Sequence, residues 1–305
     1  MLRRPALTLI TGFIVATIML VCSGVAENPT ARLQSAVNRI MRGKSGTAVI
    51  LDVDTGRLLA SSSLDIAARR LAAPGSAIKP FTLLALLRTA QFDPGEAFVC
   101  PRKLSIASKT LDCTHPLSPS GFHAVEALAY SCNNYFAAAS SRVPIDDLRQ
   151  QFEESGLFSL TGLAPREATG HMSSGLTQEQ VQLAALGEGE IVVTPLEMLQ
   201  AYRKLAQART SQADDKNYNL VFRGLEASVS YGMAHAAQTE GLAVAGKTGT
   251  AAAADSPAAT HGWFVGYAPA GHPAIVLVVY LEHGRGIDAA VLAHDLFAAW
   301  ARGAR

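Results

Sequence analysis

Residues 74–82 of the chain read Pro-Gly-Ser-Ala-Ile-Lys-Pro-Phe-Thr. Ser76 and Lys79 stand three positions apart at the start of an apolar run, and positions i and i+3 share one face of a helix. We therefore expect the Lys79 amine to reach the Ser76 hydroxyl. Pro80 lies within a turn of the predicted helix start, where its missing N–H is best tolerated. Ser76 would thus stand at a helix N-terminus, whose free N–H groups favour developing negative charge.

A lysine that acts as a base must first lose its proton. With an ordinary pKa of about 10.4, deprotonation at neutral pH costs roughly 4–5 kcal/mol. Burial of the amine or a neighbouring positive charge lowers that cost. Serine and lysine at this spacing are common by chance, and the plain alternative is a capped helix with a solvated lysine. The pair therefore predicts a second positive group near Ser76 in the fold.

Composition narrows the class of protein. The chain has 305 residues, of which 49% are hydrophobic and 17% charged, and its formal net charge is +1. These values fit one large globular domain, or two small ones, with ample core. The near-neutral charge, without a basic patch interleaved with aromatic residues, indicates that nucleic acid is not a partner.

The N-terminus carries an export signal. Arg3 and Arg4 precede an uncharged run over residues 5–26. We interpret residues 1–26 as a signal peptide or membrane anchor and residues 27–305 as the folded domain. The run is long enough to span a bilayer, and its last three residues also suit cleavage. Either way the domain is exported, to the periplasm or the outer face of the cytoplasmic membrane, and the membrane is a partner only through an uncleaved segment.

Two cysteines outside the leader bracket a short polar segment. An exported chain permits a disulfide between Cys100 and Cys113, which we favour over two free thiols. Such a small loop would contribute about 3 kcal/mol in the chain-entropy model. A zinc set of Cys100, Cys113, His115 and His123 is a less favoured alternative, because its spacing is irregular. We therefore expect neither a metal nor a cofactor.

Hydrophobic periodicity predicts an α+β fold. Apolar alternation and turns indicate a hairpin near the start and three strands near the end, over residues 47–53, 57–60, 242–252, 262–267 and 274–282. Helices are predicted at both ends of the domain, over residues 31–41 and 289–302. The inner face of the last helix should be Val291, Leu292, Leu296, Phe297 and Trp300. We expect one antiparallel five-stranded sheet flanked by these two helices, with a mainly helical lobe and the active site in the cleft between them.

The middle of the chain supplies that second lobe. Helices are expected over residues 81–87, 124–130, 135–142 and 146–158, with irregular chain over 91–121 and 160–176. Ser131-Cys132-Asn133-Asn134 interrupts two of these helices, and polar side chains in such a core-forming region need partners or a purpose. Thr194 and Glu197 form a capping box at the start of a further helix, with Pro195 at its first position.

A second lysine motif lies on the first of the late strands. Lys247-Thr248-Gly249-Thr250 supplies the cation that Lys79 requires, and Ser131 and Asn133 supply polar relay groups. The three motifs S-x-x-K, S-x-N and K-T-G follow one another in this order. That set is found in β-lactamases and penicillin-binding proteins, and its joint occurrence is far more specific than any one motif.

From about residue 31 onward the chain resembles the transpeptidase domain of penicillin-binding proteins. Beyond the three motifs, the likeness includes residues 54–56, 74–75, 194–196 and 262–269. It implies acyl transfer from a D-Ala-D-Ala stem peptide of peptidoglycan through a serine ester. It also implies β-lactams as covalent inhibitors and other cell-wall synthesis proteins as potential partners. Only about 50 residues separate the leader from Ser76, so neither the glycosyltransferase nor the pedestal domain usual in this family is expected there.

The resemblance assigns catalytic roles by position. Ser76 would be the nucleophile and Lys79 its base. Ser131 would relay a proton to the leaving amine, with electrostatic support from Lys247.

The remaining positions of the resemblance would bind substrate. Asn133 would hydrogen-bond the substrate amide, and Thr248 and Thr250, on either side of Gly249, would receive the substrate carboxylate. The backbone N–H groups of Ser76 and Thr250 would form the oxyanion hole.

Other members of the same superfamily remain as alternatives. A class A β-lactamase would need a Glu followed three or four residues later by Asn, and none lies between Asn133 and Lys247. A class D-like β-lactamase shares Trp263-Phe264-Val265-Gly266 but usually has valine where Asn133 stands. A D,D-carboxypeptidase would differ only in using water as acceptor. The non-enzymatic alternatives are a β-lactam sensor and an inactive cell-wall scaffold, and the intact motifs favour the transpeptidase.

Overall fold

The computed structural model describes residues 28–253 and 256–303. The predicted leader, residues 1–26, lies outside them. Within the described part of the chain, no helix is long and apolar enough to cross a membrane.

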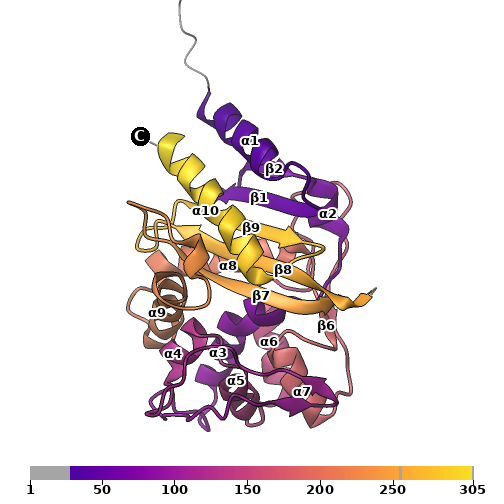
Figure 1. Cartoon of the computed structure of the whole chain (residues 1–305), viewed down its shortest axis with the longest axis vertical. Helices are drawn as coiled ribbons and strands as arrows, with labels where there is room; N and C mark the ends of the chain where they lie inside the picture. Colours follow the sequence, from indigo (N-terminus) through magenta and orange to yellow (C-terminus); the bar gives the residue numbers. More distant parts are fainter. Residues whose placement is uncertain (1–27, 254–255, 304–305) are drawn as a thin grey trace, which may run out of the picture.

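The core of the fold is a five-stranded antiparallel sheet, as the sequence predicted (Figure 1). The strand order is β2-β1-β9-β8-β7. The strands are β1 (Gly46–Asp52), β2 (Leu58–Ser62), β7 (Ala245–Ala253), β8 (Ser256–Ala268) and β9 (Ile275–Leu281). The N-terminal hairpin joins the C-terminal strands where β1 pairs with β9, with Val49 opposite Val278. Strand β7 therefore forms one edge of the sheet.

Successive side chains of a strand point to opposite faces of the sheet, and every residue of β9 is buried. Both faces of the sheet are therefore covered at β9. Leu277 and Val279 face the layer of the two terminal helices, α1 (Pro29–Ile40) and α10 (Gly286–Gly303), whereas Val276 and Val278 face the helical lobe.

The C-terminal helix departs from the predicted inner face at one position. Leu296 and Phe297 are fully buried, and Leu292 and Trp300 pack partly buried against the same cluster. Val291 is 50% exposed, so its assignment to the inner face was wrong. The helix presents a narrower apolar stripe than its composition suggests, because only residues near the axis of contact reach the sheet.

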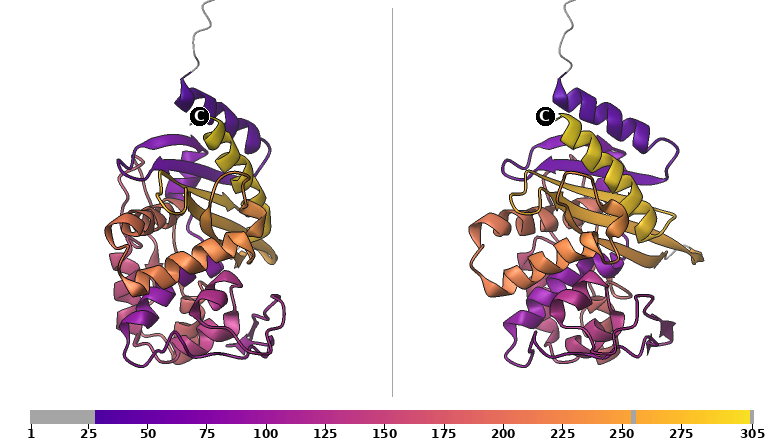
Figure 2. Two further views of the ribbon diagram at one scale, coloured as in Figure 1. Left: turned by 90° about the vertical axis from the view of Figure 1, so that its left-hand side faces the viewer. Right: turned by 60° about the vertical axis from the view of Figure 1, so that its left-hand side comes forward.

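The second lobe is mainly helical (Figure 2). Its helices are α2 (Leu64–Arg69), α3 (Lys79–Arg88), α4 (Ala124–Ala129), α5 (Asn133–Ser140), α6 (Ile145–Glu154), α7 (Gln178–Ala185), α8 (Pro195–Ser211) and α9 (Lys216–Ser230). The helices α2, α7 and α9 were not predicted from the sequence. In α9 the helical pattern of the sequence is interrupted by Gly224. Glycine is needed at this position because α9 crosses α4 there, and a β-carbon would lie 2.6 Å from Leu128 Cδ2.

Short strands occur in both segments predicted to be irregular. Ser105–Ile106 (β3) pairs with Lys109–Thr110 (β4) inside the first segment, whereas His171–Met172 (β5) of the second segment pairs with Ile191–Val192 (β6), which lies beyond it. Two-residue strands produce no periodicity that a sequence pattern could reveal.

The predicted capping box at the start of α8 is present. Glu197 N donates to Thr194 Oγ1 (3.2 Å), and Thr194 N donates to Glu197 Oε2 (2.7 Å). Helix α8 lies behind the sheet in Figure 1 and packs against β9 and β8. It supports the serine-bearing turn directly, because Tyr202 Oη donates to Ala77 O (2.8 Å).

Candidate active site

Ser76 lies in a single 3₁₀ turn, η1 (Gly75–Ile78), that runs directly into α3, with Pro80 in the first turn of that helix. Hydrogen bonds from separate elements fix the backbone around it. Gly75 N donates to Gly187 O (2.9 Å), and Trp263 Nε1 of β8 donates to Ala73 O (3.0 Å). The partly exposed Ser76 side chain is therefore held on a rigid support.

The K-T-G strand runs directly against this turn. A β-carbon at Gly249 would lie 2.3 Å from Pro74 O and 3.0 Å from Ala77 N. On the other side, Gly75 has φ +52°, and a β-carbon there would lie 2.6 Å from Thr250 O. Because both contacts are with backbone, only glycine allows the two segments to approach so closely. The structure thus brings Ser76 beside Thr250, although 173 residues lie between them in the chain.

Lys79 is completely buried and bonded to the S-x-N segment. Its Nζ donates to Ser131 O (2.9 Å), Ser131 Oγ (3.3 Å) and Asn133 Oδ1 (2.6 Å). An ammonium group has three N–H donors, so all of them are used. Within the described part of the chain, none of these bonds goes to Ser76, contrary to our expectation of a direct Lys79–Ser76 contact. Spacing placed the two on one helix face, but the S-x-N segment offers the amine better acceptors.

Burial is the main cause that lowers the pKa of Lys79, to about 8, while Cys132, Cys113 and Glu188 oppose the shift. Lys247 is also completely buried, and burial, followed by the charge of Lys79, lowers its pKa well below the usual range. The second cation is therefore present near Lys79, as predicted. We expected it to tune Lys79. Instead, burial tunes Lys79, and the repulsion between the two acts on Lys247.

Ser131 has a left-handed backbone, with φ +56°. Such a conformation costs about 1–3 kcal/mol in a residue other than glycine and persists only where the surroundings enforce it. Helix α4 ends just before Ser131, and α5 begins just after it with Cys132 as its N-cap. The polar interruption predicted between two helices is therefore a tight corner that turns Ser131 and Asn133 toward Lys79.

The threonines of the K-T-G segment have structural partners. Thr248 is 8% exposed, and its Oγ1 donates to Met233 O (3.4 Å). Thr250 is exposed, and its Oγ1 accepts from Gly286 N at the start of α10 (2.8 Å). Lys247 Nζ donates to Thr248 O (3.3 Å). Thr250 is thus accessible to solvent next to the Ser76 turn.

Glu188 belongs to the same site, although it was not predicted from the sequence. Glu188 is 8% exposed, and its carboxylate pairs with Lys109 Nζ (3.2 Å). Burial raises the pKa of Glu188, and its charge reaches Lys79. Gly187-Glu188-Gly189, an acid between two glycines, was the available signal. The pair with Lys109 joins the β3–β4 hairpin to the loop between α7 and β6 that carries Glu188.

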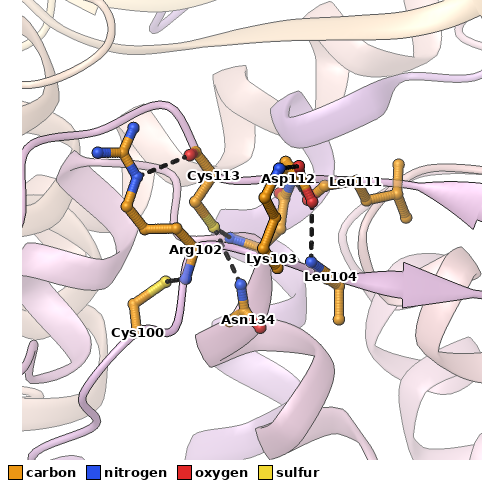
Figure 3. A network of polar contacts seen from close by, with 9 residues as sticks. Cys100, Arg102, Lys103, Leu104, Leu111, Asp112, Cys113 and Asn134 are labelled. Atoms are coloured by element: carbon orange, nitrogen blue, oxygen red, sulfur yellow. Dashed lines mark hydrogen bonds and ion pairs between the residues drawn. The ribbon is translucent and has the colours of Figure 1, made fainter.

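The predicted Cys100–Cys113 disulfide is absent, because Cys100, Cys113 and Cys132 are free thiols in the described chain. Cys132, to which we gave no role, lies with its Sγ 3.9 Å from Cys113 Sγ. Cys113 Sγ also accepts from Asn133 N (3.2 Å). It accepts from Asn134 Nδ2 (3.4 Å) as well (Figure 3). The hydrogen bond from Cys132, with those from Asn134, lowers the pKa of Cys113 to about 4. Spacing alone could not reveal that α5 brings a third cysteine to this pair.

The less favoured zinc set was predicted in the right segment but included one wrong residue, His123 in place of Cys132. Cys100, Cys113, Cys132 and His115 are all buried, and one ligand atom of each lies within 4.8 Å of the others. His123 is exposed instead, with its Nδ1 2.9 Å from Gly95 O. The structure therefore contains a set of three sulfurs and one imidazole that could hold a metal ion.

A buried lysine joined to a Ser-x-Asn corner, with a serine turn packed on a Lys-Thr-Gly edge strand, defines the penicillin-recognising class of serine acyltransferase folds. Residues 29–298 match the family described as Penicillin binding protein transpeptidase domain, and the chain belongs to this family.

Individual relatives are more distant. The chain is similar to Peptidoglycan D,D-transpeptidase MrdA of Acinetobacter baumannii, with 26% identity over 230 residues, covering 57% of this chain and 34% of the relative. The chain thus spans about a third of the length of this curated relative.

Three solved structures share the fold. The D,D-transpeptidase domain of a peptidoglycan glycosyltransferase from Eggerthella lenta has 23% identity and a TM-score of 0.74, and the match covers 88% of this chain and 80% of that chain. Pseudomonas aeruginosa PBP2 in complex with WCK 5153 has 22% identity and a TM-score of 0.76, and the match covers 88% of this chain and 77% of that chain. Helicobacter pylori PBP2 in complex with MreC has 18% identity and a TM-score of 0.76, and the match covers 87% of this chain and 62% of that chain.

Proposed function

We propose that this chain is a serine D,D-transpeptidase that cross-links peptidoglycan through an acyl-enzyme on Ser76. The observation that carries the proposal is the buried Lys79, bonded to Ser131 and Asn133 beside a serine turn that packs on the K-T-G strand. An ordinary structural lysine would not be completely buried without a carboxylate partner. Burial that lowers its pKa to about 8 leaves about a tenth of it neutral at pH 7.

In the first step, Ser76 Oγ attacks the carbonyl carbon between the two D-alanines and neutral Lys79 takes its proton. The backbone N–H groups of Ser76 and Thr250 stabilise the resulting oxyanion, which is usually the largest single contribution in such sites. Asn133 binds the peptide amide. The close packing of η1 on β7 supports these roles, because it sets both N–H groups on rigid backbone.

In the second step, the C–N bond breaks and terminal D-alanine leaves as an amine. Its proton comes from Lys79 through Ser131, for which the 3.3 Å bond between Lys79 Nζ and Ser131 Oγ provides a route. Lys247 favours this transfer electrostatically, and Thr248 and Thr250 hold the terminal carboxylate. The amine of a second stem peptide then attacks the ester, forms the cross-link and returns the proton to Ser76.

Substrate, partners and location are part of the proposal. The relative from Acinetobacter baumannii is named for peptidoglycan D,D-transpeptidation, and the Helicobacter pylori structure is a complex with MreC. By analogy we assign this chain stem peptides as substrate, β-lactams as covalent inhibitors and cell-wall synthesis proteins as partners. The leader at residues 1–26 would place the domain on the outer side of the cytoplasmic membrane.

Covalent labelling by a fluorescent penicillin tests the nucleophile. Ser76→Ala should abolish labelling and leave the thermal unfolding midpoint nearly unchanged, because the side chain is small and partly exposed. Label that still attached covalently to the variant would show that Ser76 is not the nucleophile.

The fate of the label and of a substrate separates the alternatives. A stable adduct supports a transpeptidase or carboxypeptidase, rapid turnover indicates a β-lactamase, and no adduct indicates a non-catalytic scaffold. Product analysis on a defined D-Ala-D-Ala stem peptide, with and without an acceptor amine, then decides between cross-linking and hydrolysis. Free D-alanine without any cross-linked product in the presence of acceptor would contradict the transpeptidase.

A further inference from the structure

The ester on Ser76 can react with an amine or with water, and the two nucleophiles differ in charge. An alkyl amine with an ordinary pKa of about 10.4 is an ammonium ion at neutral pH. The acceptor therefore arrives as a cation, whereas water is neutral. A negatively charged subsite would favour the amine. It should lie beside Ser131, because the acceptor amine enters where the leaving amine departs.

An aromatic pair lies next to Ser131. Tyr130 directly precedes Ser131 and ends α4, and Tyr231 ends α9. Their ring centroids lie 5.6 Å apart, with the ring planes inclined by 49°. Phe122 adds a third ring, 5.5 Å from that of Tyr130. Tyr231 is 49% exposed, so the pair presents ring surface to solvent. Aromatic ring faces attract cations.

The pair is fixed to both catalytic segments. Helix α4 packs against α9, and α9 packs against β7 (Figure 1). Met233, two residues after Tyr231, joins these elements: its N–H donates to Ala129 O (3.0 Å), and its carbonyl accepts from Thr248 Oγ1 (3.4 Å). The two tyrosines therefore stand between the S-x-N corner and the K-T-G strand.

Glu126 supplies a negative charge at this place. It lies one helical turn before Tyr130, on the same face of α4. Its Oε2 is shielded from solvent and has no hydrogen-bond partner among the described residues. Burial raises the pKa of Tyr231, and the charge of Glu126 raises it further, while Arg223 opposes this with a smaller effect. A buried carboxylate oxygen without a donor is costly, and an ammonium group would supply the missing donor.

An open pocket gives a ligand access to these groups. Its volume is about 390 Å³, within the usual range for ligand pockets. The pocket is lined by Phe122, Glu126 and Tyr130 and by the segment before α4, which contributes Leu117, Ser120 and His123. Leu117 is 71% exposed and offers apolar surface for methylene groups. The pocket thus suits an alkyl chain that ends in a cation.

We propose that Glu126, Tyr130 and Tyr231 form an acceptor subsite, which binds the ammonium group of the second stem peptide and so favours cross-linking over hydrolysis. Its ligand class is a peptide side chain that ends in a primary amine. The inference rests on the proposed acylation of Ser76 and concerns how the resulting ester selects its nucleophile.

The proton balance of the second half-reaction follows from this binding. Lys79 is neutral in the acyl-enzyme, because its proton has left with the first amine. The bound ammonium moves to Ser131 and gives one proton through Ser131 Oγ to Lys79, along the 3.3 Å bond. The neutral nitrogen then attacks the ester carbon, the C–N bond forms, and the C–O bond to Ser76 breaks. A second proton passes from the nitrogen to Ser76 Oγ, and the third stays in the new amide.

The test measures how the acyl-enzyme divides between two products. The full chain, in detergent, receives a D-Ala-D-Ala stem peptide and an acceptor amine at several concentrations, and the ratio of cross-linked to hydrolysed product is determined. Glu126→Gln keeps the size of the side chain but removes its charge. It should raise the acceptor KM and lower the ratio about tenfold, as for a lost hydrogen bond to a charged group. Glu153→Gln, at an exposed position of α6, is the matched control and should keep the wild-type ratio. Both products come from one acyl-enzyme, so changes in the acylation rate cancel.

Variants of Tyr231 test the aromatic part on a different helix. Tyr231→Leu should lower the ratio about threefold, whereas Tyr231→Phe, which retains the ring, should keep it. An aminooxy acceptor of the same length is uncharged at neutral pH and gains nothing from the acceptor subsite. Its ratio should therefore be the same in the wild type, Glu126→Gln and Tyr231→Leu.

The outcomes separate the acceptor subsite from the proposed function. A wild-type ratio in Glu126→Gln with the ammonium acceptor would overturn the acceptor subsite. Equal losses with the ammonium and aminooxy acceptors would also overturn it, because they would show a general distortion of the Ser131 corner. A wild-type acyl-enzyme that yields no cross-linked product with either acceptor would count against the proposed transpeptidase instead.

Discussion

At the scale of single residues, the proposed chemistry depends on Lys79. Its three hydrogen bonds satisfy the charged form, whereas its complete burial opposes that form. The effect of burial is the larger of the two, since the pKa of Lys79 falls to about 8. To act as a base, the Lys79 ammonium must first release a proton, which breaks one of its hydrogen bonds to Ser131 or Asn133. The lone pair that this exposes must then point toward Ser76. Both protonation states of Lys79 are therefore populated close to neutral pH.

The pH dependence of acylation follows from this pKa. The neutral amine is the active form, so the labelling rate should rise about tenfold per unit at low pH and level off near pH 8. Stopped-flow labelling between pH 5.5 and 9.5 measures this limb. Lys79→Ala should lower the rate by orders of magnitude and flatten the profile. A wild-type limb still rising at pH 9.5 would mean that Lys79 keeps its ordinary pKa.

Lys247 allows a sharper test of which lysine carries the charge. Burial and the charge of Lys79 both lower the pKa of Lys247, whereas Lys247 is not among the causes that shift the pKa of Lys79. Lys247→Gln should therefore leave the acidic limb where it is. The same variant should weaken binding of carboxylate-bearing substrates, because a bound carboxylate would recharge Lys247.

Lys247→Arg, which retains a charge, is the matched control for this experiment. If the limb of Lys247→Gln moved upward while that of Lys247→Arg stayed, Lys247 would be charged in the free enzyme and would help to tune Lys79.

At the scale of elements, the site is built where the η1 turn meets the edge strand β7. Edge strands leave unpaired N–H groups, and here the proposed oxyanion hole takes one of them, at Thr250. The contact needs a residue without a side chain at Gly249, since Pro74 O lies in the way. The capped helix α8 supports the turn from behind through Tyr202. Rigid elements on both sides set the distance between nucleophile and strand.

Gly249→Ala tests this contact. The added methyl group would lie 2.3 Å from Pro74 O, so β7 and η1 must separate. We expect a loss of about 1–3 kcal/mol in the free energy of unfolding and a decrease of at least tenfold in the penicillin labelling rate. Gly271→Ala is the control, because a β-carbon at Gly271 meets nothing within 4 Å. Equal labelling by the two variants, measured alongside chemical denaturation, would show that the approach of β7 to the turn does not matter for acylation.

At the scale of the whole molecule, distant parts of the chain close into one sheet. Strand β1 pairs with β9, and α1 packs against α10, so both ends of the domain complete the same layer. The helical lobe is an insertion between β2 and β7, and it carries both Lys79 and the S-x-N corner. The candidate site therefore lies between the sheet edge and this insertion, and it forms only when both are folded.

The sequence by itself determined the five strands, the terminal helices, the capping box of α8 and the three motifs of the site, because all of these depend on local chemistry. Periodicity, turn residues and capping act within a few residues, so they are visible in one sequence. The tertiary structure alone decided that Lys79 bonds to Ser131 and Asn133, that Glu188 joins the site, and that Cys132 meets Cys113. Each of these contacts joins residues 19 or more positions apart, and their partners are chosen by how the elements pack, which spacing along the chain does not encode.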